Sequence, residues 1–220
     1  MLLKIAVLGG TGQQGPGLAM RWARAGYSVI IGSRTLDKAI RVAGELNERL
    51  GQDLVTGMEN PAAAAAAGIS VLTVPYSAHA PTLESVRAEL QGKILVDVTV
   101  PVKPPDITKV HLPEGVSAGM EAQALLGDGV RVVSAFQNIS FHYLKDPETT
   151  IESDVLVCGD DREACVEVIQ LAKAAGMDAW YVGPIANAVA VEGLTPILVG
   201  LGKQHRRLRV GVRITGLPRE

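Results

Sequence analysis

The sequence predicts an α/β fold in which helices cover both faces of a doubly wound parallel sheet, followed by a small C-terminal extension of helix and strand. Three observations carry this prediction. Strand-like apolar runs alternate with helical ones, a glycine-rich turn follows the first apolar run, and 47% of the 220 residues are hydrophobic. Such alternation is typical of consecutive βαβ units, and a chain of this length can bury a substantial core.

The apolar runs and helical patterns can be placed in order along the chain. We expect strands near residues 4–8, 28–31, 69–74, 94–97, 130–135, 154–157 and 179–182. We expect helices near residues 14–25, 37–50, 62–67, 80–90, 119–126 and 162–175. Asn60-Pro61 is typical of a helix start, with Asn as the cap and Pro in the first turn. Asp160-Asp161 favours capping of the helix that begins at Arg162.

The turn after the first apolar run has the spacing Gly-x-Gly-x-x-Gly, formed by Gly10, Gly12 and Gly15. It lies between a predicted strand and a predicted helix. In that context one glycine makes the tight turn, one lets the backbone approach a pyrophosphate, and one lets helix and strand pack closely. The free N–H groups and the positive end of the helix then face the phosphates. The turn therefore predicts a Rossmann-type dinucleotide site.

The end of the second strand indicates which dinucleotide is bound. A site that prefers NAD would place Asp or Glu there to bind the ribose 2′-hydroxyl. This chain places Ser33 and Arg34 there, with Lys38 one turn later. A hydroxyl and two cations suit a 2′-phosphate, so we predict NADP(H). The alternative is an ordinary strand-to-helix turn beside an exposed basic cluster, and it requires the strand, the helix and the basic pair to coincide by accident.

The pattern changes after Gly183-Pro184. Residues 185–202 are mostly apolar and helical, and we expect Pro196 to kink that helix or to start its second half. Because the run is apolar around much of its circumference, we expect it to be buried against its own sheet or against a second subunit. Residues 206–213 alternate basic and apolar side chains, as a short strand does.

This change divides the chain into two expected units. Residues 1–183 would form an NADP-binding domain that includes the loops of a substrate slot. Residues 184–220 would form a helix and a strand that complete the substrate site or a dimer interface. The apolar helix favours a homodimer over a monomer.

Composition and charge exclude several other classes of function. The net charge of −2 gives no electrostatic case for nucleic acid as a partner. The two cysteines have neither a disulfide-framework nor a zinc-ligand spacing, so we expect no metal and a cytoplasmic location. The N-terminus enters a strand without a charged leader, and no apolar run is long enough to span a bilayer. We therefore expect neither a signal peptide nor a membrane partner.

Four segments should meet at the carboxyl edge of the sheet, where a nicotinamide must reach its substrate. They are residues 11–12, 73–76, 98–101 and 135–140. Taken singly, each is an ordinary strand-to-loop transition. Together they predict a mostly apolar slot with a few amides and hydroxyls, suited to a flat ring.

The sequence offers no evident proton donor or nucleophile for that slot. No tyrosine begins a Tyr-x-x-x-Lys pair, and no His-Glu-x-x-His motif or nucleophile elbow is present. We expect His79, His142 and His205 to be surface or hydrogen-bonded histidines rather than bases. Glu192, inside the apolar helix, should be paired or face a cavity. We therefore expect no catalytic side chain, and a conjugated ring as the hydride acceptor. The protein would mainly stack two rings with the reacting carbons roughly 3–3.5 Å apart.

The assembled residues resemble one family closely, the NADPH-dependent coenzyme F420 reductases, which pass a hydride between NADP(H) and a 5-deazaflavin. The matching segments run in order through nearly the full chain, at residues 9–12, 32–34 with 38, 71–75, 98–101, 133–135, 157–161, 192–196 and the tail that contains Gly211.

The resemblance implies roles for individual residues. On the NADP side it implies pyrophosphate contacts from Thr11, Gly12, Gln13 and Gln14, and 2′-phosphate contacts from Ser33, Arg34 and Lys38. Beside the nicotinamide it implies Val74, Pro75, Tyr76 and Ala135. Beside coenzyme F420, as the co-substrate, it implies Val98, Thr99, Val100, Pro101, Gln137, Asn138, Ile139 and Val210.

Two other functions stay open. An NADP-dependent reductase of a small imine or carbonyl would need Tyr76, His79 or His142 as its proton donor. A non-catalytic NADP(H)-sensing module would signal through a partner bound to the apolar residues 185–202. The physiological direction of hydride transfer does not follow from the sequence.

Overall fold

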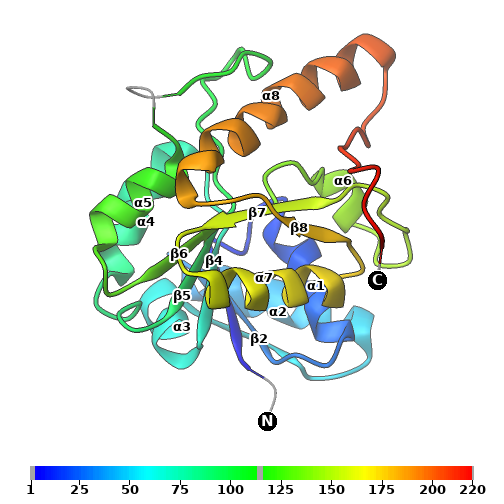
Figure 1. The fold of residues 1–220 in the computed structure, drawn as a ribbon. Coiled ribbons are helices and arrows are strands. Elements are labelled where there is room, and N and C mark those ends of the chain that lie inside the picture. Colours follow the sequence, from blue (N-terminus) through cyan, green and yellow to red (C-terminus); the bar gives the residue numbers. More distant parts are fainter. Residues whose placement is uncertain (1–2, 113–115, 220) are drawn as a thin grey trace.

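The computed structural model describes residues 3–112 and 116–219, and these form an eight-stranded sheet flanked by helices (Figure 1). The strands are β1 (Ile5–Leu8), β2 (Val29–Ser33), β3 (Val55–Glu59), β4 (Ile69–Leu72), β5 (Ile94–Asp97), β6 (Arg131–Ser134), β7 (Val155–Gly159) and β8 (Ala179–Tyr181). The helices are α1 (Gly15–Arg24), α2 (Leu36–Leu50), α3 (Asn60–Ala66), α4 (His79–Val86), α5 (Ala118–Leu126), α6 (Phe141–Leu144), α7 (Arg162–Ala174) and α8 (Ala188–His205), with short 3₁₀ turns at Tyr76–Ala78 and Ile185–Asn187. The predicted α/β class is confirmed.

The strand order is β3-β2-β1-β4-β5-β6-β7-β8. The chain leaves β1 toward β2 and β3 on one side and returns to β4 on the other, so the sheet has a switch point between β1 and β4. All neighbouring pairs are parallel except β6 and β7, which are antiparallel. The parallel sheet expected from the sequence is thus confirmed for every neighbouring pair except this one. The connection from β6 to β7 contains only the four-residue α6, rather than the crossover helix that a parallel pair requires.

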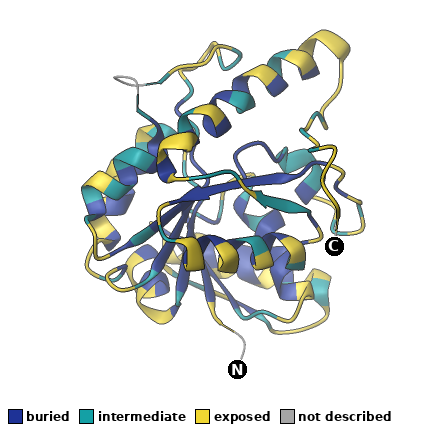
Figure 2. Cartoon of the chain, in the orientation of Figure 1, coloured by how far each residue is buried: buried dark blue, intermediate teal, exposed yellow. Residues whose placement is uncertain are grey.

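Two hydrophobic cores lie on the two faces of the sheet. Alternate residues of β1 serve them in turn: Ile5 and Val7 pack with α1, α2 and α7, while Ala6 and Leu8 pack with α3, α4 and α5. This is the period-two alternation of a strand covered on both faces. Figure 2 shows buried residues along the strands at the centre of the sheet and exposed residues on the outer sides of the helices.

The edge strand β3 was not expected from the apolar pattern. Only Val55 of its five residues is buried, and Gly57 interrupts the run. A Cβ on Gly57 would lie 2.4 Å from the carbonyl carbon of Ala39, because α2 packs directly on the strand at this point. The strand is therefore held by main-chain pairing with β2 and by this close helix contact, neither of which leaves a hydrophobic signature.

Helix α8 crosses the top of the molecule, and the C-terminal segment then turns back toward the sheet (Figure 1). The helix runs without interruption through Pro196, so it does not restart there, which was one of the two expected alternatives. Buried side chains on both sides of the proline, among them Val191 and Leu198, keep the two halves packed on the same surface. This packing offsets the main-chain hydrogen bond that proline removes.

Residues Ile185–His205 are long and apolar enough to cross a membrane, with a mean hydropathy of 1.5. Asn187, Glu192 and Thr195 interrupt its apolar residues, so it differs from the uninterrupted run that the sequence was expected to lack. In the structure 44% of this segment is buried against the rest of the protein, and the core helix of a globular domain meets the same criterion.

The strand expected at residues 206–213 is also wrong, because this segment has no regular secondary structure. It makes one main-chain hydrogen bond next to β7, from the N–H of Asp154 to the carbonyl oxygen of Val212 at 2.7 Å, and other main-chain groups of the segment bind side chains. The carbonyl oxygen of Leu208 accepts a hydrogen bond from Ser140 Oγ at 2.8 Å, and that of Arg209 accepts one from Tyr143 Oη at 3.1 Å. The C-terminal extension is thus a helix followed by an irregular segment.

Candidate functional site

The glycine turn after β1 leaves no room for side chains at two of its three glycines. A Cβ on Gly15 would lie 2.7 Å from the Cα of Gly10, and a Cβ on Gly10 would lie 2.6 Å from the carbonyl oxygen of Val7. A Cβ on Gly12 would meet nothing closer than the carbonyl oxygen of Gly9, at 3.7 Å. The outer glycines therefore make the turn and let α1 pack on it, while the middle one leaves the main chain accessible to a ligand.

The N-terminal end of α1 faces this turn without a compensating negative charge. Its first turn holds no acidic residue, no side chain caps it, and Pro16 occupies the first turn. The positive end of the helix dipole is thus available to an anion.

Asn60 holds the start of the same turn in place. Its Oδ1 accepts a hydrogen bond at 3.1 Å from the main-chain N–H of Gly9, which has a φ of +66°. The prediction that Asn60 caps its own helix is therefore wrong, because α3 has no side-chain cap. The proline at the first turn of α3 is as expected. The other predicted cap is confirmed: Asp161 Oδ1 accepts from the N–H of Ala164 at 2.9 Å.

The end of β2 lies directly beside the glycine turn, since the N–H of Gly10 donates to the carbonyl oxygen of Gly32 at 2.9 Å. Ser33 is buried, and its Oγ accepts from the N–H of Thr35 at 3.1 Å. Arg34 and Lys38 are exposed. Within residues 3–112 and 116–219, neither has an ion-pair partner. One hydroxyl and two unpaired cations therefore border the turn.

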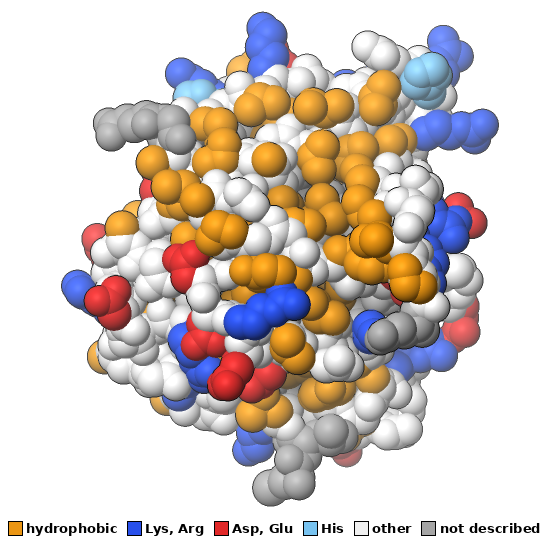
Figure 3. Space-filling view, in the orientation of Figure 1, with side chains coloured by type: hydrophobic (Ala, Val, Ile, Leu, Met, Phe, Trp, Pro, Cys, Tyr) orange, Lys and Arg blue, Asp and Glu red, His pale blue; other side chains and the backbone are white. Residues whose placement is uncertain are grey.

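A cleft of about 820 Å³ opens at the carboxyl edge of β4, β5 and β6, with α8 and the C-terminal segment as its other walls. Figure 3 shows hydrophobic side chains gathered over α8 and the hollow beneath it. Eleven of the predicted site residues line this cleft: Gln14, Val74, Pro75, Tyr76, Val98, Thr99, Val100, Gln137, Asn138, Ile139 and Val210. Size and apolar character both fit a site for a planar organic molecule.

The remaining predicted residues lie elsewhere. Ala135 is fully buried and Pro101 is buried, and neither lines the cleft. The phosphate-side residues are at the glycine turn and the end of β2, outside the cleft: Gly10, Thr11, Gly12, Gln13, Gly15, Ser33, Arg34 and Lys38.

Helix α8 supplies cleft residues that sequence reasoning missed. Thr195, Leu198 and Val199 line the cleft, and Thr195 Oγ1 donates to the carbonyl oxygen of Gln137 at 2.8 Å. A hydroxyl inside a long apolar helix was the only signal in the sequence. Lys203 and Arg207 add positive charge to the same wall.

Three buried polar atoms in the cleft-lining residues have no hydrogen-bond partner among the residues described. They are Thr99 Oγ1, Gln137 Oε1 and Asn138 Oδ1. The amide nitrogens are already used: Gln137 Nε2 donates to the carbonyl oxygen of Asp97 at 2.8 Å, and Asn138 Nδ2 donates to that of Asp154 at 2.7 Å. An unpaired buried polar group costs ~1–3 kcal/mol. A ligand with hydrogen-bonding groups on its edge would remove that cost.

Gln14 joins the glycine turn to the cleft. Its Nε2 donates to the carbonyl oxygen of Phe136 at 3.1 Å, directly after β6. Phe136 is fully buried with a φ of +71°, and its ring meets that of Trp22 edge-on at 5.9 Å between centroids. The glycine turn and the cleft are therefore adjacent, with Gln14 at their border.

Three buried ionisable side chains, His79, Asp97 and Glu192, do not line the cleft. His79 Nε2 is 2.6 Å from Asp97 Oδ2. Burial lowers the pKa of His79, but the hydrogen bond and charge of Asp97 outweigh burial and raise that pKa above its usual value. Glu192 accepts from the N–H groups of Ala118 and Gly119 at 2.8 and 3.1 Å, and burial raises its pKa to about 8. Of the expected alternatives, His79 is thus hydrogen-bonded and buried rather than at the surface, and Glu192 is paired with main-chain donors.

The other candidate proton donors differ in position. Tyr76 lines the cleft, and its hydroxyl lies 2.9 Å from both carboxylate oxygens of Glu121. His142 also lines the cleft. Burial, with Lys145 and Arg209 nearby, lowers the pKa of His142.

No group of three His, Cys, Asp or Glu side chains within the described ranges could hold a metal ion. Cys158 and Cys165 are both buried, and burial raises their pKa values to about 12 and about 11. Both thiols therefore stay protonated and unreactive near neutral pH.

A doubly wound sheet with a glycine turn and an apolar cleft at its switch point is the arrangement of nicotinamide-dinucleotide oxidoreductases. Residues 4–101 match the family described as NADP oxidoreductase, coenzyme F420-dependent. The F420-dependent NADP reductase of Methanothermobacter thermautotrophicus is 42% identical over 227 residues, covering 100% of this chain and 98% of its own. The chain belongs to this family of F420-dependent NADP reductases.

Two further relatives extend the similarity. The F420-dependent NADP reductase of Methanocaldococcus jannaschii is 38% identical, with 98% of this chain and 99% of that protein covered. A crystal structure of a protein from an Arthrobacter species superimposes with a TM-score of 0.83 at 26% identity, covering 97% of this chain and 100% of that one. The similarity therefore includes α8 and the C-terminal segment.

Proposed function

We propose that this protein is an NADP-dependent oxidoreductase that transfers a hydride between NADP(H) and the 5-deazaflavin coenzyme F420. The observation that carries the proposal is an apolar cleft of about 820 Å³ adjacent to the glycine turn, with Gln14 at their border. Two flat rings can meet in such a cleft away from water. The full-length similarity to named F420-dependent NADP reductases supports the same pair of substrates.

The phosphate groups of NADP(H) would lie on the glycine turn. Gly12 leaves the main chain open there, and the uncompensated N-terminal end of α1 suits the pyrophosphate. The 2′-phosphate would bind Arg34 and Lys38 beside Ser33. Unpaired cations and a hydroxyl fit that group, and the site lacks the carboxylate that binds a free 2′-hydroxyl in NAD-preferring proteins.

The two rings would meet in the cleft. The nicotinamide would lie against residues 74–76 after β4, next to the turn. The deazaflavin would lie against residues 98–100 and 137–139 and against Val210. Ala135 and Pro101, both buried, would support these walls from behind.

The chemistry resides in the two coenzymes, because the deazaflavin has carbon where a flavin has N5 and so accepts two electrons as a hydride. The apolar walls exclude water, and the strand ends fix the two rings against each other. The unpaired atoms of Thr99, Gln137 and Asn138 would bind polar groups at the edge of the deazaflavin. We propose that these side chains position the rings and that none of them reacts.

The direct test follows NADPH oxidation with purified protein and F420, through the loss of F420 absorbance. We expect turnover that requires both compounds. Absence of turnover by folded protein that binds NADPH would reject the proposal. Turnover of small imines or carbonyls with NADPH, and not of F420, would establish the alternative reductase instead.

A single-site variant tests the deazaflavin side. Thr99→Val removes a buried hydroxyl that has no partner within the described chain, so the fold should be preserved. We expect a rise of about tenfold in the KM for F420 and an unchanged KM for NADPH, since one neutral hydrogen bond contributes ~1 kcal/mol or more when its partner is left buried. Unchanged kinetics for F420 would remove Thr99 from its site.

We further propose that residues 1–183 form the NADP-binding domain, that residues 184–220 complete the substrate cleft, and that the protein is a cytoplasmic homodimer. Val110, Ile197 and Leu201 expose 49%, 49% and 40% of their surface, and two of the three lie on α8. A second subunit would bury this apolar surface. Light scattering that gives the mass of one chain would refute the dimer.

A further inference from the structure

The C-terminal strap, residues 206–219, forms one wall of the cleft without having a hydrophobic core of its own. Arg206, Arg207, Leu208 and Val210 line the cleft, yet the strap is mostly exposed, and Leu208 exposes 68% of its surface. Such a segment buries too little apolar surface to hold its position by packing. Its position therefore depends on polar anchors.

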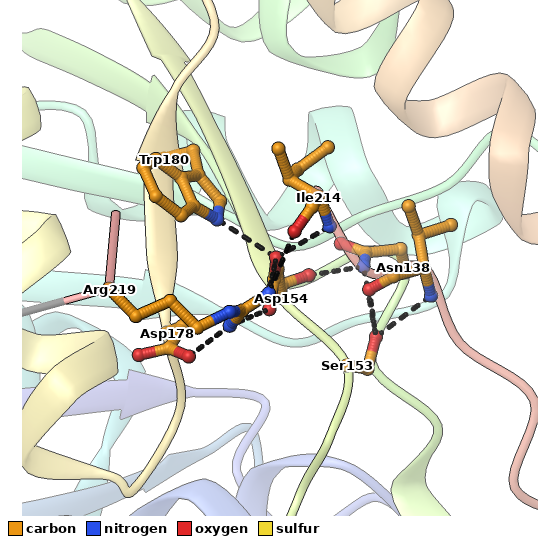
Figure 4. Close-up of polar contacts among 8 residues, drawn as sticks. Asn138, Ser153, Asp154, Asp178, Trp180, Ile214 and Arg219 are labelled. Carbon is orange, nitrogen blue, oxygen red and sulfur yellow. Dashed lines mark hydrogen bonds and ion pairs between the residues drawn. The ribbon is translucent and has the colours of Figure 1, made fainter. Parts of the chain in front are cut away.

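The principal anchor is Asp154, whose carboxylate is 1% exposed at the start of β7 (Figure 4). It accepts a hydrogen bond from the N–H of Ile214 at 2.7 Å and one from Trp180 Nε1 at 2.8 Å. Arg219 binds it with two nitrogens, Nη1 to Oδ1 at 2.9 Å and Nη2 to Oδ2 at 3.0 Å. Arg219 also pairs with Asp178. One buried carboxylate thus binds the strap at two points five residues apart.

The neighbouring Ser153 adds a second anchor on the same element. Its Oγ lies 3.1 Å from the N–H and 3.2 Å from the carbonyl oxygen of Val212, and the N–H of Asp154 donates to that carbonyl oxygen at 2.7 Å. A Cβ on Gly211 would lie 2.4 Å from Ser153 Oγ. The strap can therefore approach β7 this closely only because residue 211 has no side chain.

Asp154 is also linked to the cleft, through its main-chain carbonyl oxygen. Asn138, a buried residue of the cleft wall, donates from Nδ2 to the carbonyl oxygen of Asp154 at 2.7 Å. The strap and the loop after β6 thus meet at Asp154. Burial would raise the pKa of Asp154, but Arg219, Ile214 and Trp180 outweigh burial and lower that pKa below its usual value. The anchor therefore stays charged at neutral pH.

We propose that Asp154 and Arg219 are positioning residues for the deazaflavin side of the cleft: their ion pair holds the strap, and through it Val210 and Leu208, against the bound ring. Neither residue lines the cleft itself. The inference rests on the proposed function. It goes beyond that function because it makes deazaflavin binding depend on the Asp154–Arg219 ion pair, which lies outside the cleft. The glycine turn lies on other elements, so NADP binding should not depend on the ion pair.

The test compares Arg219→Ala with Arg213→Ala, a second arginine of the strap that is exposed and has no ion-pair partner among the described residues. For Arg219→Ala we expect the KM for F420 to rise about fivefold or more, with the KM for NADPH and kcat within twofold of the wild type, since charge-assisted hydrogen bonds are among the stronger ones. Arg219→Lys should recover part of the loss, because it restores the charge and not the two-point contact. Equal rises in both KM values, or an unchanged KM for F420, would overturn the proposal.

A readout independent of activity separates this proposal from the proposed function. Trypsin cleavage after Arg207, followed by mass spectrometry, reports release of the strap. Arg219→Ala should accelerate that cleavage at least threefold, and Arg213→Ala should leave it at the wild-type rate. Trp180 fluorescence should change in Arg219→Ala alone, because the indole N–H shares the carboxylate. If the wild type does not turn over F420, the proposed function fails. The cleavage and fluorescence measurements still show whether the ion pair holds the strap. Unchanged cleavage and fluorescence would refute it.

Discussion

The preference for NADPH over NADH should depend on Arg34 more than on any other exposed arginine of the chain. Arg34 is exposed and has no ion-pair partner within the described residues, so its removal takes nothing from the fold. The full effect should therefore fall on the ligand. A charge-assisted hydrogen bond contributes ~1.5–3 kcal/mol, and each 1.4 kcal/mol is a factor of about ten in affinity. Because solvent screens this exposed site, we expect the lower end of that range.

Isothermal titration of Arg34→Ala with both dinucleotides gives the measurement. The Kd for NADPH should rise about tenfold, and the Kd for NADH should change by less than about twofold. Arg41→Ala is the matched control: Arg41 lies on α2, which follows Arg34 in the chain, is also exposed, and pairs with Glu45 at 2.9 Å. Equal weakening of both dinucleotides in Arg34→Ala, or the same loss in Arg41→Ala, would show that the cations at the end of β2 do not bind a 2′-phosphate.

Three further predictions concern the scaffold of the site. Gly15→Ala should destabilise the protein by ~1–3 kcal/mol in urea denaturation, because its Cβ would lie 2.7 Å from the Cα of Gly10; a stability within 0.5 kcal/mol of the wild type would show that α1 can shift. Glu192→Gln should flatten the fall in unfolding free energy between about pH 4.5 and pH 8, since the unfolded chain ionises this residue before the folded one does. The exposed Glu167→Gln should leave that profile unchanged, and a wild-type profile that does not fall would contradict the raised pKa. Asp161→Ala should cost ~1 kcal/mol of unfolding free energy, because it removes the cap of α7; an unchanged thermal midpoint would contradict this role.

The sequence predicted the central strands because their burial on both faces leaves continuous apolar runs, as in Ile5–Leu8 and Val155–Gly159. It missed β3, whose pairing uses the main chain and whose Gly57 is required by the backbone of α2. The antiparallel direction of β7 could not be predicted either, because an apolar run does not indicate how a strand is oriented relative to its neighbour. The C-terminal alternation of basic and apolar residues suggested a strand, but side chains of the body, Ser153 and Asp154, take the main-chain groups that a strand partner would use.

The site was predictable where local spacing determines it. The glycine turn and the strand ends can be read from short segments, and these predicted the cleft residues of the loops after β4, β5 and β6. The contribution of α8 was not predictable in the same way, because Thr195 and Leu198 reach the cleft only through long-range packing. Asn60 illustrates the same limit: its local context indicates a helix cap, and its hydrogen bond is to Gly9, 51 residues away.

The amide of Gln14 has a consequence for the order of events during turnover. It spans from the turn after β1 to the main chain after β6, so a dinucleotide that draws this side chain toward its phosphates also releases the carbonyl oxygen of Phe136. Binding of either coenzyme would then change the affinity for the other by the same factor, since the effect of one bound ligand on the affinity for another is reciprocal. A reduced coenzyme that enters first would thus meet a different pocket from one that enters second.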